Sequence, residues 1–110
     1  MKQGEICLTF LNPVKGSEHS GTRPVVILSG NLLNTHLPLV ICCPLTSKIK
    51  NCKGNIVLKP NSDNKHTQES AILLFHIRSL SKDRLFRKIG NIGADDIELL
   101  KKGLNEILTY

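Results

Sequence analysis

Two polar side chains that can hold an anionic group stand close to a proline in this sequence. Arg23 directly precedes Pro24, and Thr46 follows Pro44 by two residues. Because proline restricts the residue before it to extended geometry, Arg23 should be held stiffly where the apolar segment 24–28 begins. A guanidinium group presents a planar fork of N–H donors that matches phosphate oxygens. The position of Arg23 therefore predicts a phosphate clamp.

Each of these segments also has a structural interpretation, which the residues alone leave open. Arg23 can be a solvated charge at the rim of a loop, and the run 44–48 can be a turn whose hydroxyl groups bond to the local backbone. Gly16 and Gly21 have the spacing of the glycines in a phosphate-binding loop, but such a loop also needs a lysine after the second glycine and then a helix. Here Pro24 and β-branched residues follow instead. Nucleotide binding by a loop of that type is therefore not expected.

The charge balance predicts an anionic partner. Fifteen Lys and Arg residues against nine Asp and Glu give a formal net charge of +6, which favours association with RNA, DNA, an acidic protein or a membrane surface. Only 4% of the residues are aromatic, and this argues against recognition of bases by aromatic stacking. A nucleic acid should therefore be held by charge, backbone contacts and a groove.

The cysteine pattern and the lack of a targeting signal indicate a cytoplasmic protein without a metal site. The sequence contains no apolar run long enough for a secretory signal or a membrane span. The four cysteines are therefore expected to be thiols, with Cys7, Cys42 and Cys43 as small apolar strand residues. Because the sequence has no CxxC pair and no HxxxH-like set, we expect neither a zinc site nor a cofactor.

Short apolar segments bounded by Asn, Gly and Pro predict a mainly β domain with one long helix. Ser81 is expected to cap a single turn through Leu85, and apolar spacing predicts an amphipathic helix over 94–108. Short strands with polar turns favour a curved, partly closed barrel over a flat sheet. One domain is expected over residues 1–110. The expected strands are 5–10, 24–28, 37–43, 55–59 and 70–77, with 86–89 as a sixth.

Four segments carry motifs that occur together in one known protein family. They are GEICLTFLNPVKGSEHSGTRPVVILSGN from residue 4, VICCPLTSKI from residue 40, ESAILLFHIRSLSKDRL from residue 69 and KIGNIGADDIELLKKGLNEIL from residue 88. In order and spacing they resemble the MazF/PemK family of toxin endoribonucleases, in which an N/S-P turn and a G-[ST]-E sequence precede an RPV strand. The resemblance covers nearly the whole chain, and four motifs in order are strong evidence.

The resemblance implies an α+β fold, a small SH3-like and partly closed antiparallel barrel of the MazF/Kid/CcdB type with a C-terminal helix. It implies a homodimeric toxin of a type II toxin–antitoxin system that cleaves single-stranded mRNA at short sequences without a metal. Attack by the 2′-OH would leave a 2′,3′-cyclic phosphate and a 5′-OH end. The implied partner is a cognate MazE-like antitoxin with an acidic tail.

Individual residues of the motifs correspond to functional positions of the family. Arg23 in the RPV motif and Thr46 in the P-[IL]-T motif correspond to its catalytic arginine and threonine. The expected RNA-binding residues are Ser17, Glu18, His19, Ser47, Lys48 and Arg78.

Two departures from the family pattern fall next to each other. Phe75 stands where the family frequently has a polar residue, and His76 where it often has Gln. We expect His76 to be packed in an apolar strand or to lie in the dimer interface. Gyrase-poison toxins and non-catalytic RNA-binding or antitoxin-binding relatives remain alternatives, although the presence of both Arg23 and Thr46 favours the nuclease over the gyrase poisons.

Overall fold

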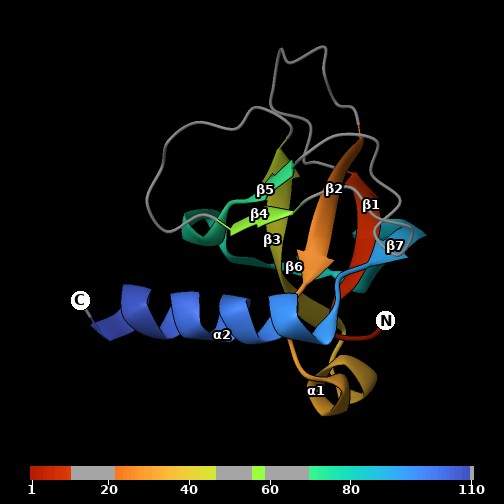
Figure 1. The fold of residues 1–110 in the computed structure, drawn as a ribbon. Helices are drawn as coiled ribbons and strands as arrows, with labels where there is room; N and C mark the ends of the chain where they lie inside the picture. The colour runs from red at the N-terminus through yellow and green to blue at the C-terminus, as the bar shows by residue number, and fades with distance from the viewer. Residues whose placement is uncertain (11–21, 47–55, 59–69, 110) are drawn as a thin grey trace.

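The fold is a curled antiparallel sheet with a long helix packed across it. The computed structural model describes residues 1–10, 22–46, 56–58 and 70–109. Its elements, in chain order, are β1 (Glu5–Phe10), β2 (Thr22–Ile27), α1 (Asn31–His36), β3 (Leu39–Thr46), β4 (Ile56–Leu58), β5 (Ser70–Ile72), η1 (Leu74–His76), β6 (Arg78–Ser81), η2 (Lys82–Arg84), β7 (Leu85–Asn91) and α2 (Ala94–Thr109) (Figure 1). Among these residues, no helix is long and apolar enough to cross a membrane.

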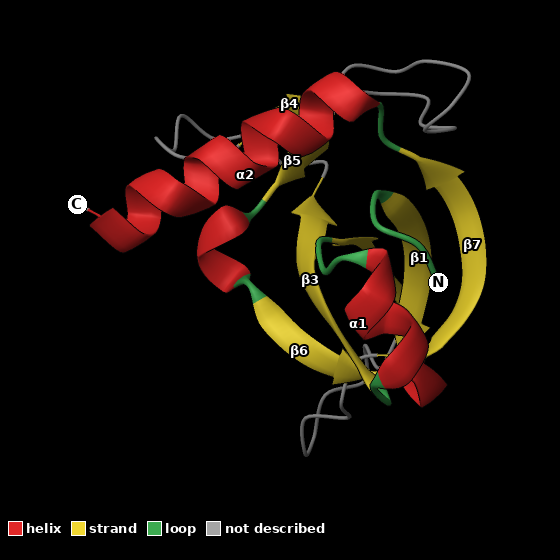
Figure 2. Ribbon diagram, turned by 90° about the horizontal axis from the view of Figure 1, so that it is seen from below, coloured by secondary structure: helices red, strands yellow, loops and turns green. Residues whose placement is uncertain are grey.

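The sheet has seven strands, and β3 is its most connected member. The strand order is β4-β5-β3-β2-β1-β7, and β6 pairs with β3 beside this path. Figure 2 shows β6, β3, β1 and β7 following one curve, so that the sheet is partly closed rather than flat. The predicted fold class, a partly closed antiparallel barrel with a C-terminal helix, is confirmed.

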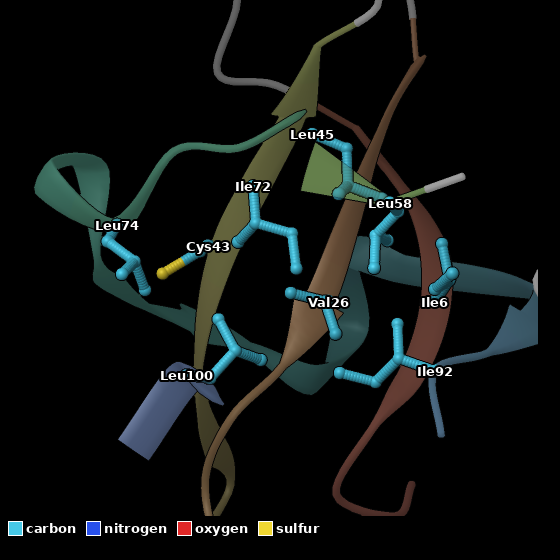
Figure 3. Packing of buried hydrophobic residues seen from close by; sticks show 9 residues of the cluster. All are labelled: Ile6, Val26, Cys43, Leu45, Leu58, Ile72, Leu74, Ile92 and Leu100. Carbon is cyan, nitrogen blue, oxygen red and sulfur yellow. The ribbon is translucent and has the colours of Figure 1, made fainter. Parts of the chain in front are cut away.

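The core consists of two clusters of buried side chains. The larger one joins strands to α2 through Leu100, which is 1% exposed (Figure 3). Ile97, Leu104 and Ile107 of α2 pack against this cluster. The apolar spacing in 94–108 predicted this stripe, but Leu108, which was expected to belong to it, is 85% exposed. The second cluster gathers Cys7, Val25, Ile27, Val40, Cys42, Leu80 and Leu85. The predicted burial of Cys7, Cys42 and Cys43 is confirmed.

Strand β3 runs through Pro44, and the prediction that this proline ends the strand is wrong. Pro44 is buried opposite Val25 of β2. Its carbonyl oxygen accepts a hydrogen bond from the N–H of Leu73 at 2.9 Å, so its backbone nitrogen also faces the side of β5 and η1. On that side of β3, the stretch that pairs with β6 and the stretch that pairs with β5 are separated by a gap that includes Pro44. A residue without an N–H is tolerated there because no ladder bond is lost.

The apolar run 70–77 was predicted to be one strand, but it is a short strand followed by a helical turn. β5 ends at Ile72, and the N–H groups of His76 and Ile77 then donate to the carbonyls of Leu73 and Leu74 at 3.0 and 3.2 Å. β6 begins at Arg78. A continuous run of buried apolar residues does not distinguish a strand from a turn, and the sequence carries no glycine or proline to mark the break.

The short helix α1 was not predicted, because its first residues have the composition of a turn. Its N-terminus lacks a side-chain cap, and a buried polar cluster holds it instead. The Ser29 hydroxyl donates to Asn34 Oδ1, Asn34 Nδ2 donates to the Ser29 carbonyl at 2.8 Å, and Ile41 N donates to Ser29 Oγ at 3.0 Å. These bonds tie α1 to β3, and long-range contacts of this kind leave no local sequence signal.

Several predicted boundaries agree with the structure. The strand 5–10 is confirmed without change, and the helix 94–108 extends by one residue to Thr109. Ser81 Oγ accepts a hydrogen bond from Asp83 N at 3.4 Å and so caps η2, as predicted.

Candidate functional site

A cleft of about 130 Å³ opens where β1, β2, β3, η1 and β6 meet. Its lining residues are Thr9, Arg23, Val25, Pro44, His76, Arg78 and Leu80. The strand pairing explains why they gather, because Thr9 lies opposite Arg23 and Val25 lies opposite Pro44. The volume equals that of about four water molecules, enough for a phosphate group.

Two guanidinium groups reach this cleft from different strands. Arg23 lies near the start of β2 and Arg78 begins β6, and both side chains are exposed. No ion pair joins either arginine to another residue of the described ranges. Val25 and Leu80, at 3% and 6% exposure, are the apolar part of the cleft lining. Two cations that share a cleft, with no counter-ion among the described residues, form a site suited to an anion with several oxygens.

Thr9 is a residue of the cleft that sequence reasoning missed. Its side chain is fully buried, and its hydroxyl makes a long hydrogen bond of 3.4 Å to the carbonyl of Phe10. Successive strand residues point to opposite faces, so Thr9 shares a face of β1 with Cys7. This alternation was the sequence signal that could have predicted an inward-facing Thr9. Thr9 adds a hydroxyl group directly across from Arg23.

His76 also lies in the cleft, and the expectation that it is packed in an apolar strand is wrong. It ends η1, and its side chain is exposed. The physical reason for its exposure is the helical turn, because the chain leaves the sheet at η1. A continuous strand would have kept His76 in the sheet. Its position two residues before Arg78 was the only sequence signal for this placement.

Thr46 lies at the same end of the sheet as Arg23 but is not one of the residues that line the cleft. It is the last residue of β3, is partly buried and pairs with Ala71 of β5. Since β2 and β3 are antiparallel neighbours, the start of β2 and the end of β3 lie at the same end of the sheet. The predicted residues Ser17, Glu18, His19, Ser47 and Lys48 lie outside the described residues.

The buried thiols are chemically quiet. Burial raises the pKa of Cys42 to about 11, although the charge of Arg78 opposes the shift, and burial raises that of Cys43 to about 12. Burial also raises the pKa of Cys7, with the Glu5 carboxylate adding to the effect. A thiol needs its thiolate form to act as a nucleophile or metal ligand. Within the described ranges, no group of three His, Cys, Asp or Glu side chains could hold a metal ion.

Comparison with known proteins gives consistent results at the level of sequence and structure. Residues 2–108 match the family described as PemK-like, MazF-like toxin of type II toxin–antitoxin system. The Endoribonuclease MazF of Staphylococcus saprophyticus is 40% identical over 90 residues, which cover 81% of this chain and 75% of that protein.

Solved structures of similar fold come from Deinococcus radiodurans. Its MazF in crystal form I has a TM-score of 0.79 at 25% identity and covers 100% of this chain and 97% of its own. Its MazE–MazF structure in form III has a TM-score of 0.81 at 24% identity, covering 98% and 95%. Together with the family match over residues 2–108, these findings show that the chain belongs to the PemK-like and MazF-like toxins of type II toxin–antitoxin systems.

Proposed function

We propose that this toxin is an endoribonuclease that cleaves single-stranded mRNA at short sequences without a metal ion. The observation that carries the proposal is the cleft in which Arg23 and Arg78 face one space without a counter-ion among the described residues. The 40% identity to a protein named as an endoribonuclease supports the same activity. One toxin domain spans residues 1–110, and the protein acts in the cytoplasm, where mRNA is found.

The chemistry uses the nucleophile that RNA itself carries. The ribose 2′-oxygen attacks the adjacent phosphorus, the bond from phosphorus to the 5′-oxygen breaks, and the products are a 2′,3′-cyclic phosphate and a 5′-OH. Arg23 binds the non-bridging oxygens and stabilises the charge that develops on them, because a donor aimed at such an oxygen acts mainly in the transition state. It does not act as the base, since arginine stays protonated in proteins. Thr46 holds the phosphate in line for attack from the end of β3.

His76 supplies proton transfer in this scheme, because histidine is the side chain that most readily gains and loses a proton near neutral pH. It shares the cleft with Arg23 and Arg78. His76→Ala should therefore lower kcat for RNA cleavage by about 10²-fold, the low end for general acid–base catalysis, since water can replace the imidazole.

The matched control for this prediction is His36→Ala, which changes an exposed histidine of α1 that does not line the cleft. Its kcat should match that of the unmodified protein. Equal kcat values for both variants would remove His76 from the mechanism.

The proposed activity is tested by incubating the purified toxin with single-stranded RNA in excess EDTA. Cutting that leaves 2′,3′-cyclic phosphate and 5′-OH ends is the expected result. A DNA strand of the same sequence should remain intact because it lacks the 2′-OH. Metal-dependent cutting, or inhibition of gyrase supercoiling without RNA cleavage, would contradict the proposal.

The natural inhibitor in this proposal is a MazE-like antitoxin with an acidic segment. Structures similar to this chain include an endoribonuclease with its cognate antitoxin from a mycobacterial species, at 21% identity and a TM-score of 0.78. The net charge of +6 suits an acidic ligand that covers the arginines of the cleft.

A homodimer is the proposed assembly, and an apolar cleft of about 170 Å³ supports it. Leu33, Leu37, Leu39 and Ile41 line this cleft between α1 and β3 and are 40–49% exposed. A cluster of exposed apolar side chains can mark a protein–protein contact, and one patch can pair with itself about a two-fold axis. Leu37→Glu should convert a dimer into a monomer in light scattering, whereas Leu108→Glu, at an 85% exposed site on α2, should not. A monomeric unmodified protein would contradict the assembly.

A further inference from the structure

We infer that Phe10 and Phe86 form a stacking platform that binds an unpaired base of the RNA strand. The inference rests on the proposed ribonuclease function and adds a base-binding site to it. Neither residue lines the cleft of Arg23 and Arg78, so the platform is a separate subsite, for a nucleotide that flanks the cleaved step.

The two rings already stack on each other and remain open to solvent. Their centroids are 4.3 Å apart, and the ring planes differ by 24°. Phe10 is still 51% exposed and Phe86 44%, so each ring retains a free surface. A stacked aromatic pair with an open outer face is the geometry onto which a nucleobase adds as the next ring, and such stacking tolerates any base.

The platform lies at a sheet edge close to the cleft. Phe10 ends β1 opposite Thr22, which is the residue before Arg23. Phe86 belongs to β7, which ends the strand order. Phe10 and Thr9 are neighbours on a strand and point to opposite faces, so a strand of RNA would pass over the end of β1 to reach both sites.

Two cationic residues follow Phe86 directly on β7. Arg87 follows Phe86, is exposed and has no ion pair with any residue of the described ranges. Lys88 is partly neutralised, because its ammonium group lies 3.4 Å from Glu5. An aromatic pair followed by an arginine that has no ion pair within the described ranges combines a surface for a base with a charge for its phosphate. Single-stranded nucleic acids are bound in this way without sequence preference. An apolar protein partner would need no such cation.

The aromatic residues of this chain are distributed unusually. The low aromatic content argued against base stacking, yet all three phenylalanines are exposed at 44–62% while aliphatic and cysteine side chains fill the core. Phe75 lies on η1, which is on the opposite side of the molecule from β7 in Figures 1 and 2. Phe75 therefore serves as an internal control, because it is exposed and stacks on no other ring of the residues that the structure describes.

The experiment measures binding of two probes that the enzyme cannot cut by its proposed chemistry. One is a deoxyadenosine 12-mer and the other a 12-mer of abasic deoxyribose phosphate with the same charge. The unmodified protein should bind the first more tightly, because only it offers bases. Phe86→Leu and Phe10→Leu should each weaken binding of the first probe roughly five- to 150-fold, with binding of the abasic probe unchanged. Phe86→Tyr should restore the preference, and Phe75→Leu should leave it intact.

Several outcomes would overturn the platform, and they are separable from failure of the ribonuclease proposal. Equal affinity of the unmodified protein for both probes, or equal effects of Phe86→Leu and Phe75→Leu, would reject stacking even if RNA is cut normally. Unchanged DNA binding together with a changed mass in light scattering would assign the pair to a protein interface instead. Conversely, a base preference that depends on Phe86 would support the platform even if the unmodified protein fails to cleave RNA.

Discussion

Cleavage of single-stranded RNA should fall about 10²- to 10³-fold when Arg23 is replaced by alanine, the loss seen when one donor to a developing oxyanion is removed. Arg23→Lys should recover only part of the rate, because an ammonium group lacks the planar fork of two N–H donors. Initial rates on one RNA in EDTA measure both effects. The unfolding midpoint should not change, since Arg23 is exposed and has no ion pair with any residue of the described ranges.

The control for Arg23→Ala is Lys102→Ala, which removes the same charge from an exposed position on α2. Both variants lower the net charge equally, so a general loss of attraction for RNA would affect them alike. Full activity of Arg23→Ala, or an equal loss in Lys102→Ala, would exclude a specific role of the guanidinium in the transition state.

Leu100→Ala should cost about 2–5 kcal/mol of unfolding free energy, because it removes a buried side chain and leaves a cavity between α2 and the sheet. Leu100 is 1% exposed, whereas its neighbour Leu99 is 51% exposed. The substitution Leu99→Ala has the same chemistry and the same helix propensity, and should cost less than about 0.5 kcal/mol. Urea unfolding at one protein concentration compares the two, since association also contributes to stability.

Equal midpoints for the two leucine variants would show that α2 does not close the core. A further sign of close packing is that a Cβ added at Gly103 of α2 would lie 2.6 Å from Leu74 Cδ1 of η1. The helix backbone therefore approaches η1 so closely that a larger residue at position 103 requires the Leu74 side chain to shift. Leu100 lies on the packed side of the same helix.

The sequence predicted the regular elements whose pattern is local. The alternation of 5–10 and the helical spacing of 94–108 each repeat over enough residues to be read without tertiary information. The turn at 74–76 and helix α1 depend on distant partners, namely the carbonyl of Pro44 and the N–H of Ile41. Neither partner can be identified from the neighbouring sequence, so these elements were mispredicted or missed.

The candidate site was predicted to a similar extent. Arg23 and Arg78 were identified from motifs, and the structure brings both to one cleft. Thr9 and His76 reach the cleft through the pairing of β1 with β2 and through the turn η1. These long-range arrangements turn an ordinary strand threonine and a histidine in an apolar run into cleft residues. The catalytic role of Thr46 stays a prediction, since it does not line the cleft.

The attachment of β6 affects how mutational scans of this toxin should be interpreted. Within the described residues, β6 pairs with β3 and with no other strand. Arg78 therefore depends on residues 39–42 of β3 for its position, whereas Arg23 is held by β1. A substitution at Val40 or Cys42, which are buried, can therefore displace Arg78 while every charged side chain is intact. In the proposed mechanism such a displacement would lower activity through lost alignment, and it would not by itself identify a new catalytic group.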